Sequence, residues 1–124
     1  MRKAYLSKGW LIAIALFGLA ACQTTANSAD RLTADQVRAT FIGHEWKGSS
    51  GTFLFAEDGT WRYRDPRTDV HGTYQIADDG VVCATNAPDS TRAGLTTCYT
   101  FYRDGSGYRY WHDRSGRFWP AYVR

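Results

Sequence analysis

The side chains best able to do chemistry in this 124-residue chain are three histidines, two adjacent serines and a few paired carboxylates. The histidines are His44, His71 and His112, and none has the spacing of a metal-binding or metalloprotease motif. His44-Glu45 and His112-Asp113 are adjacent pairs, but neighbours on a strand point to opposite faces of a sheet. The sequence therefore predicts no metal, and it leaves open only a site assembled in three dimensions.

The serines and carboxylates also lack a catalytic context. Ser49-Ser50 lies in GSSG, which differs from the GxSxG elbow and has no strand-to-helix turn around it. Glu57-Asp58 and Asp78-Asp79 fall in predicted turns, whereas glycosidase carboxylates need a cleft. The sequence also contains no Walker loop or dinucleotide fingerprint. We therefore expect a protein without enzymatic activity or cofactor, with an unrecognised hydrolase as the enzyme alternative.

The first 21 residues have the pattern of an export signal. Arg2, Lys3 and Lys8 give a basic start, and Gly9 to Ala21 carry no charge. At about 1.5 Å per residue, a helix of this length is too short to cross a hydrocarbon core of ~30 Å. A basic start, a short apolar stretch and small residues are typical of a secretory signal. The pattern therefore predicts export.

The end of this segment, Leu19 to Cys22, reads LAAC and resembles the lipobox of bacterial lipoproteins. The resemblance implies that the signal peptide 1–21 is removed and that Cys22 becomes a lipid-bearing first residue. Acyl chains such as palmitate then anchor the protein to the membrane, stably when two or more are attached. Gln23, rather than an aspartate, follows the cysteine, which implies the periplasmic side of the outer membrane. The inner membrane is the alternative location.

With Cys22 lipidated, two cysteines remain, Cys83 and Cys98, and their even number suits an oxidising compartment. The pair lacks the close spacing of a redox CxxC motif and the further ligands of a zinc site. Closing a loop of about 15 residues stabilises a fold by on the order of 3 kcal/mol in the chain-entropy model. We therefore predict a structural Cys83–Cys98 disulfide.

The apparent basicity of the chain comes from its first residues. The full chain has 15 Lys+Arg and 12 Asp+Glu, and Arg2, Lys3 and Lys8 account for the whole difference. The remaining chain is balanced in charge, which gives no argument for a nucleic-acid partner. Residues 22–31 form a polar tether after the lipidated cysteine, and residues 32–124 form one small domain.

The pattern of the domain predicts one short helix followed by strands. Thr33 caps a helix over 33–40, Gln36 completes a capping box, and Leu32 with Val37 forms a hydrophobic staple. After the helix, apolar residues recur with a period of two and turn signals recur at short intervals. The predicted strands span 42–47, 51–56, 60–64, 70–76, 81–85, 96–103, 107–112 and 117–123.

Eight short antiparallel strands joined in sequence predict an all-β meander that closes into a barrel, because closure removes exposed edges. The helix is expected to cover one mouth of the barrel. An open meander or a small sandwich of the same strands is the alternative. Nine bulky side chains are predicted to point inward and fill the interior: Trp46, Phe53, Phe55, Trp61, Tyr63, Tyr74, Ile76, Tyr99 and Phe101.

Several short motifs follow one another along the domain. They are GHEW from Gly43, FAEDGTW from Phe55, GTY from Gly72, the two cysteines, and YRDG from Tyr102. This series, over about residues 33–112, resembles a family of small bacterial exported proteins classed as a domain of unknown function. The early glycine and tryptophan also resemble the Gly-x-Trp of lipocalin-like barrels. Neither resemblance implies catalytic residues.

Two functions are compatible with this sequence. The first is a non-enzymatic envelope component, structural or partner-binding, anchored through Cys22 and monomeric. Its candidate surface is formed by Arg62, Arg64, Arg109 and Trp111, which suit an anionic glycan or another envelope protein, although a solvated barrel face is the favoured explanation of these residues. The second is a lipocalin-like carrier of a small apolar ligand, which requires a cavity of roughly 300 Å³ or more.

Overall fold

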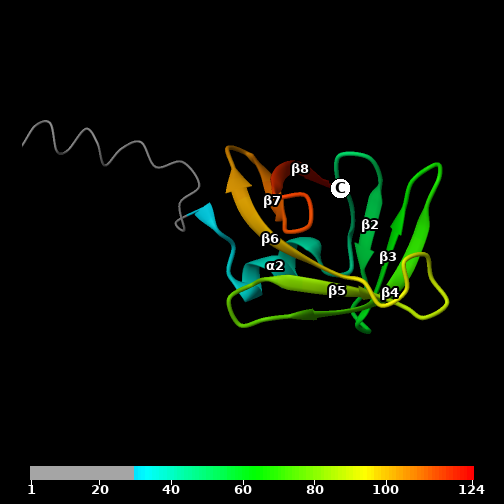
Figure 1. Ribbon diagram of the computed structural model, residues 1–124. Coiled ribbons are helices and arrows are strands. Elements are labelled where there is room, and N and C mark those ends of the chain that lie inside the picture. The colour runs from blue at the N-terminus through cyan, green and yellow to red at the C-terminus, as the bar shows by residue number, and fades with distance from the viewer. Residues whose placement is uncertain (1–29) are drawn as a thin grey trace, which may run out of the picture.

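The computed structural model describes residues 30–124, and it consists of one short helix and a closed antiparallel barrel of eight strands (Figure 1). This confirms the predicted fold class. The predicted signal peptide 1–21, the lipidation site Cys22 and most of the tether 22–31 lie outside the described residues. From residue 30 onward, no helix has the length and apolar character that a membrane crossing requires.

Each strand pairs with the next one along the chain, and β8 pairs with β1 to close the barrel. The elements are α2 (Ala34–Phe41), β1 (Glu45–Lys47), β2 (Thr52–Phe55), β3 (Thr60–Arg64), β4 (Asp69–Ile76), β5 (Val82–Asn86), β6 (Thr96–Asp104), β7 (Gly107–His112) and β8 (Arg117–Val123). The largest departure from the predicted bounds is at β1, which begins three residues late. Gly43 adopts a φ of +79° there and turns the chain between helix and strand.

The helix begins as the sequence predicts. The Thr33 hydroxyl accepts a hydrogen bond from the Gln36 backbone N–H at 3.2 Å, and the Thr33 N–H donates to the Gln36 side chain at 2.8 Å. Leu32 and Val37, the two residues of the predicted staple, are both buried. The helix ends at Phe41, one residue later than predicted, since the next residue, Ile42, has an extended backbone. The ring of Phe41 is fully buried.

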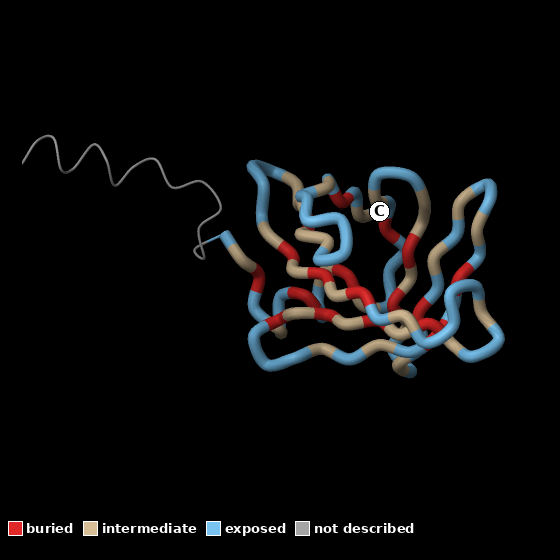
Figure 2. Tube along the Cα trace, in the orientation of Figure 1, coloured by how far each residue is buried: buried red, intermediate tan, exposed pale blue. Residues whose placement is uncertain are grey.

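The helix plugs one end of the barrel. The Phe41 ring stacks on Phe101 with ring centroids 4.1 Å apart, and it meets the edges of Trp46 and Tyr108. Trp46 in turn stacks on Phe53 at 4.2 Å, so aromatic packing continues from the helix into the barrel. Figure 2 shows that buried positions alternate with more exposed ones along the strands.

The opposite end of the barrel is not filled, and here the prediction of a side-chain-filled interior is wrong. Three of the inward positions at this end carry small or short side chains, Val70, Asn86 and Thr97, and they leave a pocket between the aromatic side chains that also point inward there. Trp61 lies against Gly72, and its indole N–H donates to the Thr85 carbonyl at 3.3 Å. The interior is therefore packed near the helix and hollow at the other mouth.

Cys83 and Cys98 lie directly opposite each other on β5 and β6, with their sulfur atoms at a disulfide distance of 2.07 Å. Their neighbours Val82 and Ala84 are buried, whereas both cysteines are only half-buried. The bond therefore lies on the outer face of the sheet, at the base of the long β5–β6 loop.

Replacing Cys83 and Cys98 together by alanine should lower the free energy of unfolding by about 3 kcal/mol, because the 15-residue loop is then unconstrained in the unfolded chain. Urea denaturation of the oxidised protein and of the double variant measures this difference. The pocket described below should survive, since the disulfide faces outward. An unchanged urea midpoint would show that the bond does not constrain the unfolded state.

Candidate functional site

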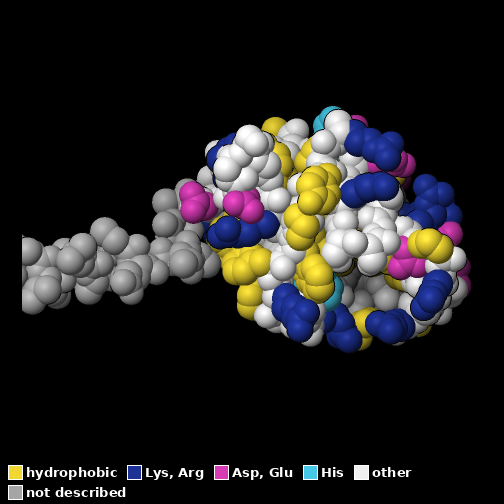
Figure 3. Space-filling view, turned by 90° about the horizontal axis from the view of Figure 1, so that it is seen from above, with side chains coloured by type: hydrophobic (Ala, Val, Ile, Leu, Met, Phe, Trp, Pro, Cys, Tyr) yellow, Lys and Arg dark blue, Asp and Glu magenta, His cyan; other side chains and the backbone are white. Residues whose placement is uncertain are grey.

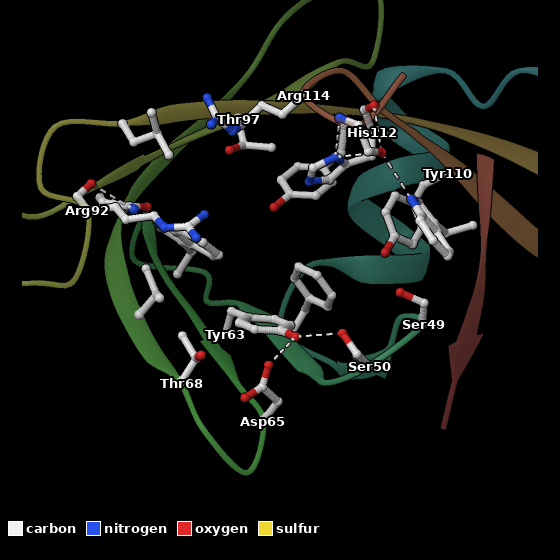
Figure 4. Close-up of a pocket in the computed structure, with 18 of the residues that line it drawn as sticks. Ser49, Ser50, Tyr63, Asp65, Thr68, Arg92, Thr97, Tyr110, His112 and Arg114 are labelled. Carbon is white, nitrogen blue, oxygen red and sulfur yellow. Dashed lines mark hydrogen bonds between the residues drawn. The ribbon is translucent and has the colours of Figure 1, made fainter. Parts of the chain in front are cut away.

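A pocket of about 410 Å³ opens at the end of the barrel opposite α2 (Figure 4). The β1–β2, β3–β4, β5–β6 and β7–β8 connections surround its mouth. Its walls carry six aromatic side chains: Phe53, Trp61, Tyr63, Tyr99, Tyr110 and Trp119. Phe53, Trp61 and Tyr99 are 5%, 6% and 3% exposed, so the floor is deeply buried and apolar.

The GSSG turn between β1 and β2 forms one part of the rim. A Cβ at Gly48 would lie 2.7 Å from the Tyr110 hydroxyl, and one at Gly51 would lie 2.6 Å from the Tyr63 ring. Only glycine at these positions lets both phenols approach the turn. The Ser50 hydroxyl is 2.9 Å from the Tyr63 hydroxyl, so this serine belongs to a rim network.

Tyr63 and Asp65 form the acidic side of the pocket. The Tyr63 hydroxyl donates to one Asp65 carboxylate oxygen at 2.8 Å, and the Arg67 N–H donates to the other at 2.8 Å. The bond from Tyr63, followed by that from Arg67, lowers the pKa of Asp65 below its ordinary value. Burial raises the pKa of Tyr63, so its hydroxyl stays protonated and keeps donating to the carboxylate. Asp65 is therefore ionised but already satisfied by its neighbours.

His112 lies on the wall formed by β7 and makes a serine–histidine contact. Its Nδ1 accepts the Ser115 backbone N–H at 3.0 Å and lies 3.0 Å from the Ser115 hydroxyl, which also accepts the Trp119 indole N–H. Burial lowers the pKa of His112, which favours the neutral ring. Because Nδ1 accepts a hydrogen bond, the proton of the neutral ring is on Nε2.

The His112–Ser115 contact closes the β7–β8 turn. The neighbouring carboxylate, Asp113, accepts the Cys98 backbone N–H at 3.0 Å. The imidazole is thus oriented by the turn itself, whereas a catalytic triad needs a third group that holds the base. The arrangement supplies a hydrogen-bond donor to the pocket.

Two arginines, Arg92 and Arg114, line the mouth and are exposed at its rim. Neither guanidinium forms an ion pair with any residue in the described part of the chain. Figure 4 places both on the side of the pocket that faces away from Asp65. The pocket is therefore polarised, with cationic groups on one side and a satisfied carboxylate on the other.

The β5–β6 loop that carries Arg92 is held by a buried asparagine. The Asn86 side-chain amide donates to the carbonyls of Thr91 and Arg92, at 3.1 and 3.0 Å. Backbone hydrogen bonds also run from the Asn86 N–H to the Leu95 carbonyl and from the Gly94 N–H to the Asn86 carbonyl. The predicted long loop is consequently a defined part of the pocket wall.

The arginines that the sequence suggested for a binding surface lie on two separate parts of the barrel. Arg62 makes two hydrogen bonds to Asp69, at 2.9 and 2.6 Å, and Arg64 lies 4.0 Å from a Glu45 carboxylate oxygen. The bond to Asp69 raises the pKa of Arg62. Both arginines on β3 thus have carboxylate partners.

Arg109 and Trp111 lie on the outer face of β7. The Arg109 guanidinium is 4.7 Å from the centre of the Phe118 ring and 5.5 Å from that of Tyr102, and Trp111 packs edge-on against Phe118. Figure 3 shows a stripe of hydrophobic side chains on the side of the molecule seen from above Figure 1. Since β3 and β7 are four strands apart in the closed order, the four residues do not form one patch.

The other histidines lie away from the pocket lining. His71 Nε2 is 3.0 Å from an Asp89 oxygen, on the outer side of the β5–β6 loop, and His44 is exposed before β1. Across residues 30–124, no three His, Cys, Asp or Glu side chains gather closely enough to hold a metal ion.

No family model, curated protein or solved structure matches this chain. The pocket itself has an apolar aromatic floor, hydroxyl and imidazole groups on its walls, and two arginines at the rim. Such a combination can bind a small molecule whose larger part is apolar and whose remainder is polar.

Proposed function

We propose that this protein binds a small, partly apolar molecule in the pocket at the open end of its barrel. The observation that carries the proposal is the pocket volume of about 410 Å³. Ligand pockets begin at roughly 300 Å³, and an eight-stranded barrel either fills its interior with side chains or holds one small ligand. The small inward residues near the mouth favour the second arrangement.

The outer surface supports a partner-binding role less directly. Phe118 and Tyr122 are 37% and 63% exposed, but Arg62 and Arg109 already have carboxylate or aromatic neighbours. The lipid anchor at Cys22 and the periplasmic location are predictions from the N-terminal sequence. Together with the pocket they describe a membrane-tethered carrier or sensor of small molecules.

Replacing Thr97 by phenylalanine should weaken ligand binding roughly tenfold or more, because the added ring occupies the pocket. Thr97 is 8% exposed and its side chain lines the pocket. The probe is N-phenyl-1-naphthylamine, an uncharged dye whose fluorescence rises in apolar surroundings. We would titrate it into residues 23–124, which retain every described element and the whole core.

The matched control is Thr100→Phe. Thr100 lies on the same strand, opposite Trp111, and its side chain belongs to the outer face. This variant should bind the dye like the wild type. Equal binding by Thr97→Phe and the wild type, or no dye binding by the wild type, would refute the proposed pocket function. Native mass spectrometry of protein purified from periplasm would show whether a natural ligand is retained.

A further inference from the structure

Building on the proposed pocket function, we propose that the ligand is an amphipathic anion. The two rim arginines, Arg92 and Arg114, bind its acidic group, and the aromatic floor binds its apolar body. The ligand class is a small molecule with a carboxylate or comparable acidic group on a flat or chain-like apolar part.

The first argument is the charge of the groups that face the pocket. Arg92 and Arg114 bring two positive charges, and Asp65 brings the one carboxylate of the pocket lining. Both Asp65 oxygens accept hydrogen bonds, from Tyr63 and from the Arg67 backbone. The tyrosines of the wall are protonated, since burial raises the pKa of Tyr63, Tyr99 and Tyr110. An entering anion therefore meets unpaired cations, whereas a cation would meet a carboxylate already bonded to its neighbours.

The second argument is the backbone at Arg92. Its φ of +56° is the one positive value at a non-glycine position among residues 30–124. This left-handed conformation costs an L-residue free energy that glycine, or to a lesser extent asparagine, avoids. The side-chain amide of the buried Asn86 holds the backbone of Arg92 in this conformation by donating hydrogen bonds to the carbonyls of Thr91 and Arg92. Strained backbone conformations of this kind cluster at functional sites, which is consistent with a functional role for the Arg92 side chain.

The third argument is the order of groups from the mouth inward. The guanidinium groups are at the exposed rim, whereas Phe53, Trp61 and Tyr99 are deeply buried. The neutral His112, with its proton on Nε2, adds a donor on the wall. An amphipathic anion can enter with its apolar end first and leave its acidic group between the arginines and solvent. A wholly apolar ligand would leave the two rim guanidinium groups to solvent alone.

The test uses two dyes that share one apolar body. 1-Anilinonaphthalene-8-sulfonate carries a sulfonate, and N-phenyl-1-naphthylamine has the same rings without it. The variant is Arg92→Asn with Arg114→Gln, because asparagine tolerates the backbone of residue 92 and neither substitution carries charge. The control is Arg38→Gln with Arg103→Gln, which removes two exposed arginines outside the pocket lining.

We expect the pocket variant to bind the sulfonate dye roughly tenfold more weakly, as for loss of two solvent-exposed charge contacts, and to bind the uncharged dye within about twofold of wild type. The control variant should change neither affinity. If the pocket variant binds both dyes like the wild type, the anion inference fails while the pocket function stands. If the wild type binds neither dye, both proposals fail.

Discussion

Replacing Gly72 by alanine should lower the free energy of unfolding by about 3 kcal/mol or more, a large share of the stability of a small domain. A Cβ at this position would overlap the Thr85 carbonyl oxygen and lie 2.9 Å from the Trp61 indole nitrogen. The first of these atoms belongs to the backbone of the paired strand β5, so the clash cannot be relieved by a side-chain rotation. The strands must separate or the sheet must bend.

Gly107→Ala is the matched control for Gly72→Ala. Gly107 also lies in a strand, β7, and the nearest atom to its added Cβ is the Asp104 carbonyl oxygen at 3.8 Å, an ordinary contact. Urea denaturation should give this control a stability within about 0.5 kcal/mol of wild type. If both glycine variants were equally stable, the tight approach of β4 and β5 would not exist in solution.

Replacing Phe41 by alanine should cost about 3–5 kcal/mol of unfolding free energy, because it removes the ring that fixes the helix in the barrel. The ring is fully buried and contacts Trp46, Phe101 and Tyr108. The cavity left behind lies at the plugged end, so we also expect faster amide hydrogen exchange in α2 than in the strands.

Arg38→Ala is the control for Phe41→Ala, since Arg38 is on the same helix and exposed. Its stability should stay within about 0.5 kcal/mol of wild type. Urea denaturation and hydrogen exchange measure the two effects independently. Unchanged helix protection in the Phe41 variant would mean that α2 is held mainly by Leu32 and Val37.

The fold could be predicted because local signals agree with it. The capping box of Thr33 and Gln36 sets the start of the helix, and Asp-Gly pairs mark the turns between β2 and β3, β4 and β5, and β6 and β7. The start of β1 was predicted too early because the apolar Ile42 extends the strand pattern, whereas the chain still turns at Gly43. The positive φ of Gly43 depends on how the chain passes from the helix into the barrel, and the local strand pattern does not contain that information.

The pocket could not be predicted from the alternation of inward and outward residues alone. Alternation shows that Val70, Gly72 and Thr97 point inward, but it does not show that they share one end of the barrel. The register and closure of the sheet place Val70, Asn86 and Thr97 around one pocket. For the same reason, the sequence did not show that the predicted arginine surface is divided. Closure of the sheet places Arg62 and Arg109 on opposite sides of the barrel.

The helix that plugs the barrel and the first described residues of the chain lie at the same end of the barrel. The Leu32 N–H donates to the Phe101 carbonyl at 2.9 Å, and Arg31 pairs with Asp79 at 3.2 Å, both beside the helix. If the predicted lipid at Cys22 anchors the chain, the plugged end would be the anchored one and the mouth would point away from the anchor. A ligand bound as proposed could then enter and leave on the side away from the anchor.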